Sequence, residues 1–260
     1  VVKLATYNYN VVGEISKMEI VNDTIFILDK KTKSVYSFLL DGSYLCKIGK
    51  VGQGPGEYVE PTSMSVSENC VVIYDQWQHK AIEYSHDGNL LSDRQLPFFC
   101  QKVIPMDNGD KLCFEEAADN YHLPMILDYC FWQCDSSYTI VKKKGLYSEH
   151  DKTISNGDLP IYHYDGRFFY FSITKNSFYE INKDGSINCL VKINFEPEYP
   201  DEFYTNLSFR LDLEKNSNAV SVTNFLMTDT HAIYNVTGYG KSVCYFFHTS
   251  ISNLPTLTMP

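Results

Sequence analysis

The sequence predicts an all-β fold, a β-propeller built from four-stranded blades. Short β-rich runs recur along the chain with a period in the forties, and Asp-Gly pairs recur at the same place in three of the copies. Aromatic residues make up 15% of the chain, with 20 Tyr and 16 Phe, and these residues suit half-buried strand surfaces. A period of roughly 40–50 residues with about four strands per unit is typical of propeller blades.

The repeat is clearest where strands alternate with turns. A shift of 46 residues, from Asp29 to Asp75, brings the second copy into register with the first without a gap. A shift of 143 residues, from Asp29 to Ser172, does the same for the fourth copy. In these three copies the third strand is followed by the pairs Asp41-Gly42, Asp87-Gly88 and Asp184-Gly185. An Asp-Gly pair between two strands predicts a tight hairpin, because both residues tolerate positive φ.

The repeats predict five recognisable blades in a single domain over residues 1–260. Their expected bounds are about 11–48, 62–96, 100–145, 157–195 and 220–250. Antiparallel strands alternate in direction, so the turns between second and third strands should share one face with the connectors between blades. The Asp-Gly turns should lie on the other face. The insert 195–218 lengthens the first of these faces, and its run 201–213 is expected to form a short helix.

Charge, hydropathy and cysteine spacing exclude several classes of function. The net charge of −10 argues against duplex nucleic acid as a partner and against anionic membrane surfaces. No apolar run approaches the roughly 18–20 residues of a membrane span, so no transmembrane segment is predicted. The eight cysteines contain no CxxC pair and no Cys/His cluster with zinc spacing. We predict buried thiols, no metal and no cofactor.

The junction after the first blade carries a family resemblance. The run Ile48–Tyr58, followed by Pro61, resembles the blade connector of NHL-type propeller repeats. It is more similar still to that of exported six-bladed propellers of Bacteroides-type bacteria, which are often lipoproteins. Asp29 and Asp75, each at the end of a second strand, add to the resemblance.

The resemblance implies a location and a ring but no reaction. It implies a six-bladed propeller in the periplasm or at the outer membrane, with a lipid anchor on a removed N-terminal segment; the chain starts at Val1, which leaves room for one. It also implies that residues 1–7 form a strand that closes the last blade. Five copies of the repeat are recognisable, so the sixth is missing, was removed, or is built from segments that do not align.

Two conspicuous features have structural interpretations. A glycine-rich loop can bind phosphate when a helix N-terminus follows, but here a strand follows, so we expect a connector in which Glu57 binds backbone amides. Asp29 and Asp75 occupy equivalent positions on different blades, and Asp at such a position readily caps a turn. Neither feature predicts a reaction.

The predicted ligand-binding residues lie on the face with the longer loops. They are Trp77 and His79 in the second blade, Tyr121 and His122 in the third, and Tyr204 in the insert. Binding residues concentrate on loops held by a rigid scaffold, and an exposed Trp beside polar residues suits sugar or peptide contact. The alternative for Trp77 is that its ring folds onto its own blade.

Together these observations favour a non-enzymatic binding propeller of the bacterial cell envelope. Its partner would be a glycan, a peptide or an envelope protein. No G-x-S-x-G motif occurs, and the expected inner-strand runs 15–18, 63–66, 102–105 and 222–225 lack an Asp/Glu/His set suited to a metal, so we predict no catalytic residues. Two alternatives remain: a metal-dependent propeller hydrolase or lyase with its site in the central channel, and a scaffold for neighbouring envelope proteins.

Overall fold

A computed structural model gives the fold, and it describes most of the chain. The described residues are 1–106, 108–115, 120–146, 161–164, 167–172, 175–182, 186–195, 200, 202–203, 206–216, 220–228, 230–238, 241–248 and 257–259. The chain divides into two compact units, Val1–Gly145 and Leu146–Pro260. The predicted fold class is confirmed: the chain is an all-β propeller with four-stranded antiparallel blades. A single domain over the whole chain stays a prediction.

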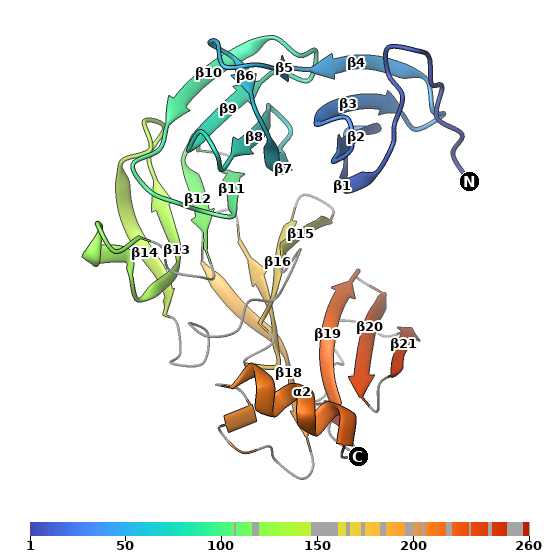
Figure 1. Cartoon of the computed structure of the whole chain (residues 1–260), viewed down its shortest axis with the longest axis vertical. Helices are drawn as coiled ribbons and strands as arrows, with labels where there is room; N and C mark the ends of the chain where they lie inside the picture. Colours follow the sequence, from blue (N-terminus) through green and yellow to red (C-terminus); the bar gives the residue numbers. More distant parts are fainter. Residues whose placement is uncertain are drawn as a thin grey trace. The chain divides into compact units, whose positions relative to one another are not determined.

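The first unit contains three four-stranded blades, drawn in blue to green in Figure 1. Blade 1 consists of β1 (Ile15–Val21), β2 (Thr24–Asp29), β3 (Ser34–Leu39) and β4 (Tyr44–Ile48). Blade 2 consists of β7 (Pro61–Val66), β8 (Val71–Asp75), β9 (Lys80–Tyr84) and β10 (Leu90–Gln95). Blade 3 consists of β11 (Lys102–Pro105), β12 (Lys111–Phe114), β13 (Tyr129–Cys134) and β14 (Ile140–Leu146). Each blade is a meander, so its turns alternate between two faces as predicted.

The repeat holds at the level of single hydrogen bonds. At the end of the second strand, a polar side chain accepts a hydrogen bond from the amide three residues further on. The bonds are Thr32 to Asp29 at 2.9 Å, Gln78 to Asp75 at 3.1 Å and Lys175 to Ser172 at 3.2 Å. The predicted turn-capping role of the two aspartates is therefore confirmed, and Ser172 has the same role with a shorter side chain.

Two hydrophobic clusters lie between the blades of the first unit. One lies between blades 1 and 2 and contains Phe26, Ile73 and Tyr84. The other lies between blades 2 and 3 and contains Phe98 and Trp132. Four of the eight cysteines belong to the second cluster: Cys70, Cys100, Cys113 and Cys134. Cys130 is also buried, whereas Cys46 is half-buried and Cys189 and Cys244 are exposed, so the prediction of buried thiols is confirmed for five of them.

In its described residues the second unit contains two sheets and the helix α2 (Leu207–Asn216). The first sheet has four antiparallel strands, β15 (Ile161–Tyr164), β16 (Arg167–Ser172), β17 (Ser177–Ile181) and β18 (Ile187–Phe195), and β22 (Leu257–Met259) adds a parallel strand to β18. The second sheet is β19 (Val220–Met227), β20 (His231–Gly238) and β21 (Lys241–His248). The helix expected in the insert is present as α2 (Leu207–Asn216), which begins later than predicted.

The N-terminal segment corrects one expectation. Residues 1–14 contain no strand, so a strand over residues 1–7 is wrong. Instead the Ala5 amide donates to the Gly42 carbonyl at 2.8 Å, and Leu4 and Val12 pack against apolar side chains of β2 and β3. The segment follows the apolar face of blade 1 because Leu4 and Val12 are partly buried there.

Candidate ligand-binding surface

The turn between β8 and β9 is held by one buried carboxylate. Asp75 accepts hydrogen bonds from the amides of Trp77 at 3.0 Å and Gln78 at 3.1 Å. Its other oxygen accepts from the amides of Val59 at 2.6 Å and Glu60 at 3.1 Å in the connector from blade 1. The aspartate therefore fixes the backbone under Trp77, whose side chain is 74% exposed. The alternative that Trp77 folds onto its own blade is wrong.

In blade 3 a buried amide side chain, that of Asn120, bonds the turn to the preceding connector. Asn120 accepts from the Phe99 amide at 2.8 Å and donates to the Phe99 carbonyl at 2.9 Å. The Leu123 amide closes the next turn on the Asn120 carbonyl at 2.8 Å. Tyr121 lies within this turn, and its side chain is 77% exposed. Two exposed aromatic rings are thus carried by turns that are fixed from within.

Three further rings meet between these turns. The ring centroids of His79 and Phe99 lie 4.2 Å apart at an interplanar angle of 85°, and those of Phe99 and His122 lie 6.1 Å apart at 83°. His122 is also fixed by a 2.7 Å contact from Nε2 to the Pro97 carbonyl. A carbonyl only accepts, so Nε2 carries the proton and Nδ1 of the neutral ring is an acceptor. We call Trp77, His79, Phe99, Tyr121 and His122 the aromatic cluster.

The aromatic cluster includes four of the five predicted binding residues. Contacts through Phe99 join His79 of one blade to His122 of the next. Phe99 itself was missed, because it lies in a short connector and matches no repeat position that would mark it. Tyr204 lies outside the described residues.

The glycine-rich connector is structural, as predicted. The Glu57 carboxylate accepts from the Gly54 amide at 2.9 Å and pairs with Lys50 at 2.8 Å. The hydrogen bond from Lys50, followed by that from the Gly54 amide, lowers the pKa of Glu57. Tyr84 donates to the Gly56 carbonyl at 2.7 Å. These bonds join the connector to itself and to blade 2, as expected of a structural loop.

The inner strands carry a buried ion pair that sequence reasoning missed. Glu19 on β1 lies 3.1 Å from the Lys102 ammonium on β11, and it accepts from the Val66 amide on β7 at 2.8 Å. Glu19 lies one residue beyond the expected inner-strand run 15–18, and its partner Lys102 is 83 residues away. Within the part of the chain that the structure describes, no group of three or more His, Cys, Asp or Glu is arranged to hold a metal ion.

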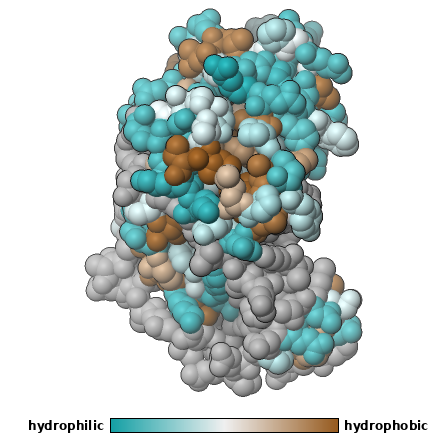
Figure 2. Space-filling view, turned by 90° about the vertical axis from the view of Figure 1, so that its left-hand side faces the viewer, coloured by the Kyte–Doolittle hydropathy of each residue, from teal (hydrophilic) through white to brown (hydrophobic). Residues whose placement is uncertain are grey.

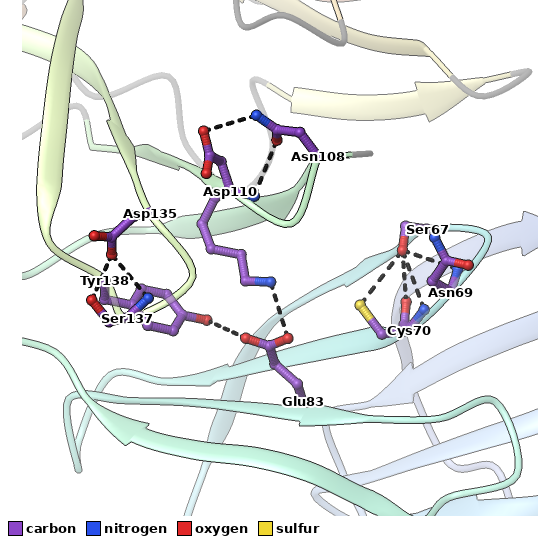
Figure 3. A network of polar contacts seen from close by, with 10 residues as sticks. Ser67, Asn69, Cys70, Glu83, Asn108, Asp110, Asp135, Ser137 and Tyr138 are labelled. Carbon is purple, nitrogen blue, oxygen red and sulfur yellow. Dashed lines mark hydrogen bonds and ion pairs between the residues drawn. The ribbon is translucent and has the colours of Figure 1, made fainter.

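A second buried ion pair joins blades 2 and 3. Glu83 on β9 lies 3.0 Å from the Lys111 ammonium on β12 and accepts from the Tyr138 hydroxyl at 3.1 Å. Figure 3 shows Tyr138 and Glu83 pointing toward one another. Burial raises the pKa of Tyr138, and the nearby charge of Glu83 adds to the rise, so Tyr138 stays a proton donor. This network is satisfied internally, and it supports the blades.

The outer strands carry exposed apolar residues of their own. Leu45 on β4, Leu91 on β10 and Val141 on β14 are all exposed. Figure 2 shows a hydrophobic patch within a largely hydrophilic surface. Exposed apolar residues of this kind are common on soluble surfaces, and we assign them no role. Among the described residues, no helix combines the length and the apolar character that a membrane crossing requires.

Comparison with known proteins gives the family. Residues 1–254 match the model of a domain of unknown function, DUF4934. The chain belongs to this family. No curated protein matches it.

Solved structures of low sequence identity share the fold. A Bacteroides fragilis protein whose name describes it as exported matches with a TM-score of 0.76 at 20% identity, over 95% of this chain and 72% of its own. A member of the DUF4221 family from Bacteroides vulgatus matches with a TM-score of 0.54 at 8% identity, over 87% of this chain and 71% of its own. At these identities the likeness concerns the fold alone.

Proposed function

We propose that this DUF4934 protein is a non-enzymatic binding protein of the bacterial cell envelope, and that it binds its ligand on the aromatic cluster. The ligand is a glycan, a peptide or a segment of an envelope protein. The protein acts outside the cytoplasm, in the periplasm or at the outer membrane, and a lipid anchor holds it there. The exported protein of similar fold supports the location.

The observation that carries the proposal is the combination of exposure and rigidity at Trp77 and Tyr121. A large aromatic ring in water exposes apolar area, which favours contact with a partner. Here the backbone beneath Trp77 is bonded to Asp75, and the turn around Tyr121 is bonded through Asn120. A ligand would therefore not have to order these turns, and the entropic cost of binding would be small.

Immobilised glycans, peptides and envelope extracts provide the test. We expect the protein to be retained by at least one of them, and the double variant Trp77→Ala/Tyr121→Ala to bind at least tenfold more weakly. Asn89→Ala is the matched control, since Asn89 is an exposed residue beside an Asp-Gly turn on the opposite face. Retention that survives the double variant, or that falls with Asn89→Ala, would place the site elsewhere. A hydrolase activity without retained ligand would overturn the proposal.

A further inference from the structure

The chemistry of the aromatic cluster allows the ligand class to be narrowed. This inference rests on the proposed function and deepens it. Three short segments supply the surface: 76–79, 95–101 and 120–127. They contain rings, amides and aliphatic side chains but no Asp, Glu, Lys or Arg. Lys80, which follows the first segment, is paired with Asp93 at 2.9 Å. The exposed Arg94 and Asp128 flank the second and third segments, but the segments themselves carry no charged side chain, and this composition suits an uncharged ligand.

The backbone of these turns offers few hydrogen bonds to a peptide. The amides of Trp77 and Gln78 donate to Asp75. Leu96 donates to the His79 carbonyl at 2.7 Å. Both the amide and the carbonyl of Phe99 are bonded to Asn120. Peptides that are recognised by strand addition need unpaired backbone groups along an edge, and here these groups are already bonded.

What the surface does offer is ring faces with neutral polar groups beside them. A sugar ring has an apolar face of C–H groups and a rim of hydroxyls. The C–H groups carry partial positive charge, which favours contact with the negative face of an aromatic ring. Hydroxyls need neutral donors and acceptors. Gln76 and His122 Nδ1 are such groups, and so is Gln95, whose side-chain amide donates to the Gln78 carbonyl at 3.3 Å.

We propose that the aromatic cluster binds a neutral glycan chain. Sugar rings stack on Trp77 and Tyr121, and their hydroxyls bind the glutamine amides and His122. Phe99 is a positioning residue, because its ring contacts both histidines without being among the most exposed side chains. Since the cluster takes rings from two blades, the ligand contacts both with more than one sugar unit.

Tryptophan fluorescence gives a direct test, because the two tryptophans differ in environment. Trp132 is buried at 1% exposure and Trp77 is exposed, so a ligand stacked on Trp77 should change only the Trp77 emission. The probes are neutral oligosaccharides of one, three and six units, namely β-1,4-, β-1,3- and α-1,4-linked glucans and mannans. We expect at least one hexasaccharide to bind at least tenfold more tightly than its monosaccharide.

Matched variants separate stacking from fold. Trp77→Ala and Tyr121→Ala should each weaken the hexasaccharide at least tenfold, measured by calorimetry. Trp77→Phe and Tyr121→Phe retain a ring face and should stay within about threefold to fivefold of wild type. Phe99→Leu should weaken binding, while the change in Trp77 fluorescence emission at saturating ligand stays the same. Asn89→Ala should change nothing.

Two further probes separate this inference from the proposed function. They are uncharged peptides of six to ten residues and acidic oligosaccharides such as oligogalacturonate. If peptides bind through Trp77 and no oligosaccharide does, the glycan assignment is wrong and the proposed function stands. If acidic chains bind more than tenfold tighter than neutral ones, the neutral assignment is wrong. If no glycan, peptide or envelope extract binds, both proposals are wrong.

Discussion

Blades 1 and 2 are joined in part by neutral hydrogen bonds from tyrosine hydroxyls, and blades 2 and 3 in part by a buried ion pair. At the first junction Tyr58 donates to the Ile48 carbonyl at 3.0 Å, and Tyr84 donates to the Gly56 carbonyl. At the second junction the Glu83 carboxylate accepts from both Lys111 and Tyr138. Two successive junctions between blades are thus stabilised by different kinds of polar contact.

The connectors at these two junctions differ in length and in hydrogen bonding. The connector between blades 1 and 2 includes the short strands β5 (Lys50–Val51) and β6 (Glu57–Tyr58), and Glu57 folds it onto itself. The connector between blades 2 and 3 is short and bonded by Asn120, and the aromatic cluster lies there. The first connector is bonded to itself through Glu57, whereas Trp77 and Tyr121 beside the second connector are exposed. Three pairs of variants test this contrast.

The largest effect is expected from Lys111→Met, which leaves the Glu83 carboxylate buried without its cation. Breaking a buried pair from one side costs about 3–5 kcal/mol, so the free energy of unfolding in urea should fall by this amount. The double variant Glu83→Gln/Lys111→Met removes both charges and should regain more than half of the loss. If Lys111→Met lost less than about 1 kcal/mol, the second junction would not depend on its ion pair.

The next effect concerns the glycine at the first junction. Gly49 has φ of +66°, and a Cβ there would lie 2.5 Å from the Tyr84 hydroxyl oxygen and 2.8 Å from a Tyr58 ring carbon. Backbone strain and overpacking together should make Gly49→Ala about 2–4 kcal/mol less stable. Gly109→Ala is the control, because Gly109 has φ of +86° but nothing within 4 Å of a Cβ. Gly109→Ala should show the backbone strain alone, about 1 kcal/mol. Both variants are measured by thermal and urea unfolding. If Gly49→Ala and Gly109→Ala lost the same stability, the tyrosine rings beside Gly49 would be able to move aside at no cost.

The smallest effect compares two buried hydroxyls directly. Tyr138→Phe removes a hydrogen bond to a charged group and should cost about 1.5–3 kcal/mol. Tyr58→Phe removes a hydrogen bond to a neutral carbonyl and should cost about 1 kcal/mol. Both are read from the free energy of unfolding in urea under identical conditions. A larger loss for Tyr58→Phe would reverse the contrast between the two junctions.

Much of the fold follows from local patterns that the sequence displays. Strand alternation recurs from blade to blade and the Asp-Gly turn recurs in three copies, so the hydrogen-bonded turns at Asp29, Asp75 and Ser172 could be predicted from their spacing. Four residues of the candidate site could be predicted for the same reason, because they lie in turns that the repeat locates. The position of the N-terminal segment could not be predicted from the sequence, since its apolar side chains could have packed against many apolar faces.

The sequence by itself therefore determined the strands, the turns and the face on which Trp77 and Tyr121 lie, because those depend on neighbours within one blade. Only the tertiary structure decided what happens between blades. In blade 3, Asn120 bonds the connector as Asp75 does in blade 2, but from a different position in the repeat. The Phe99 ring contacts two histidines, and Glu19 forms an ion pair with Lys102, 83 residues away. A period-two strand pattern says that a side chain leaves the sheet on one face, but the partner that it meets there depends on how neighbouring blades pack.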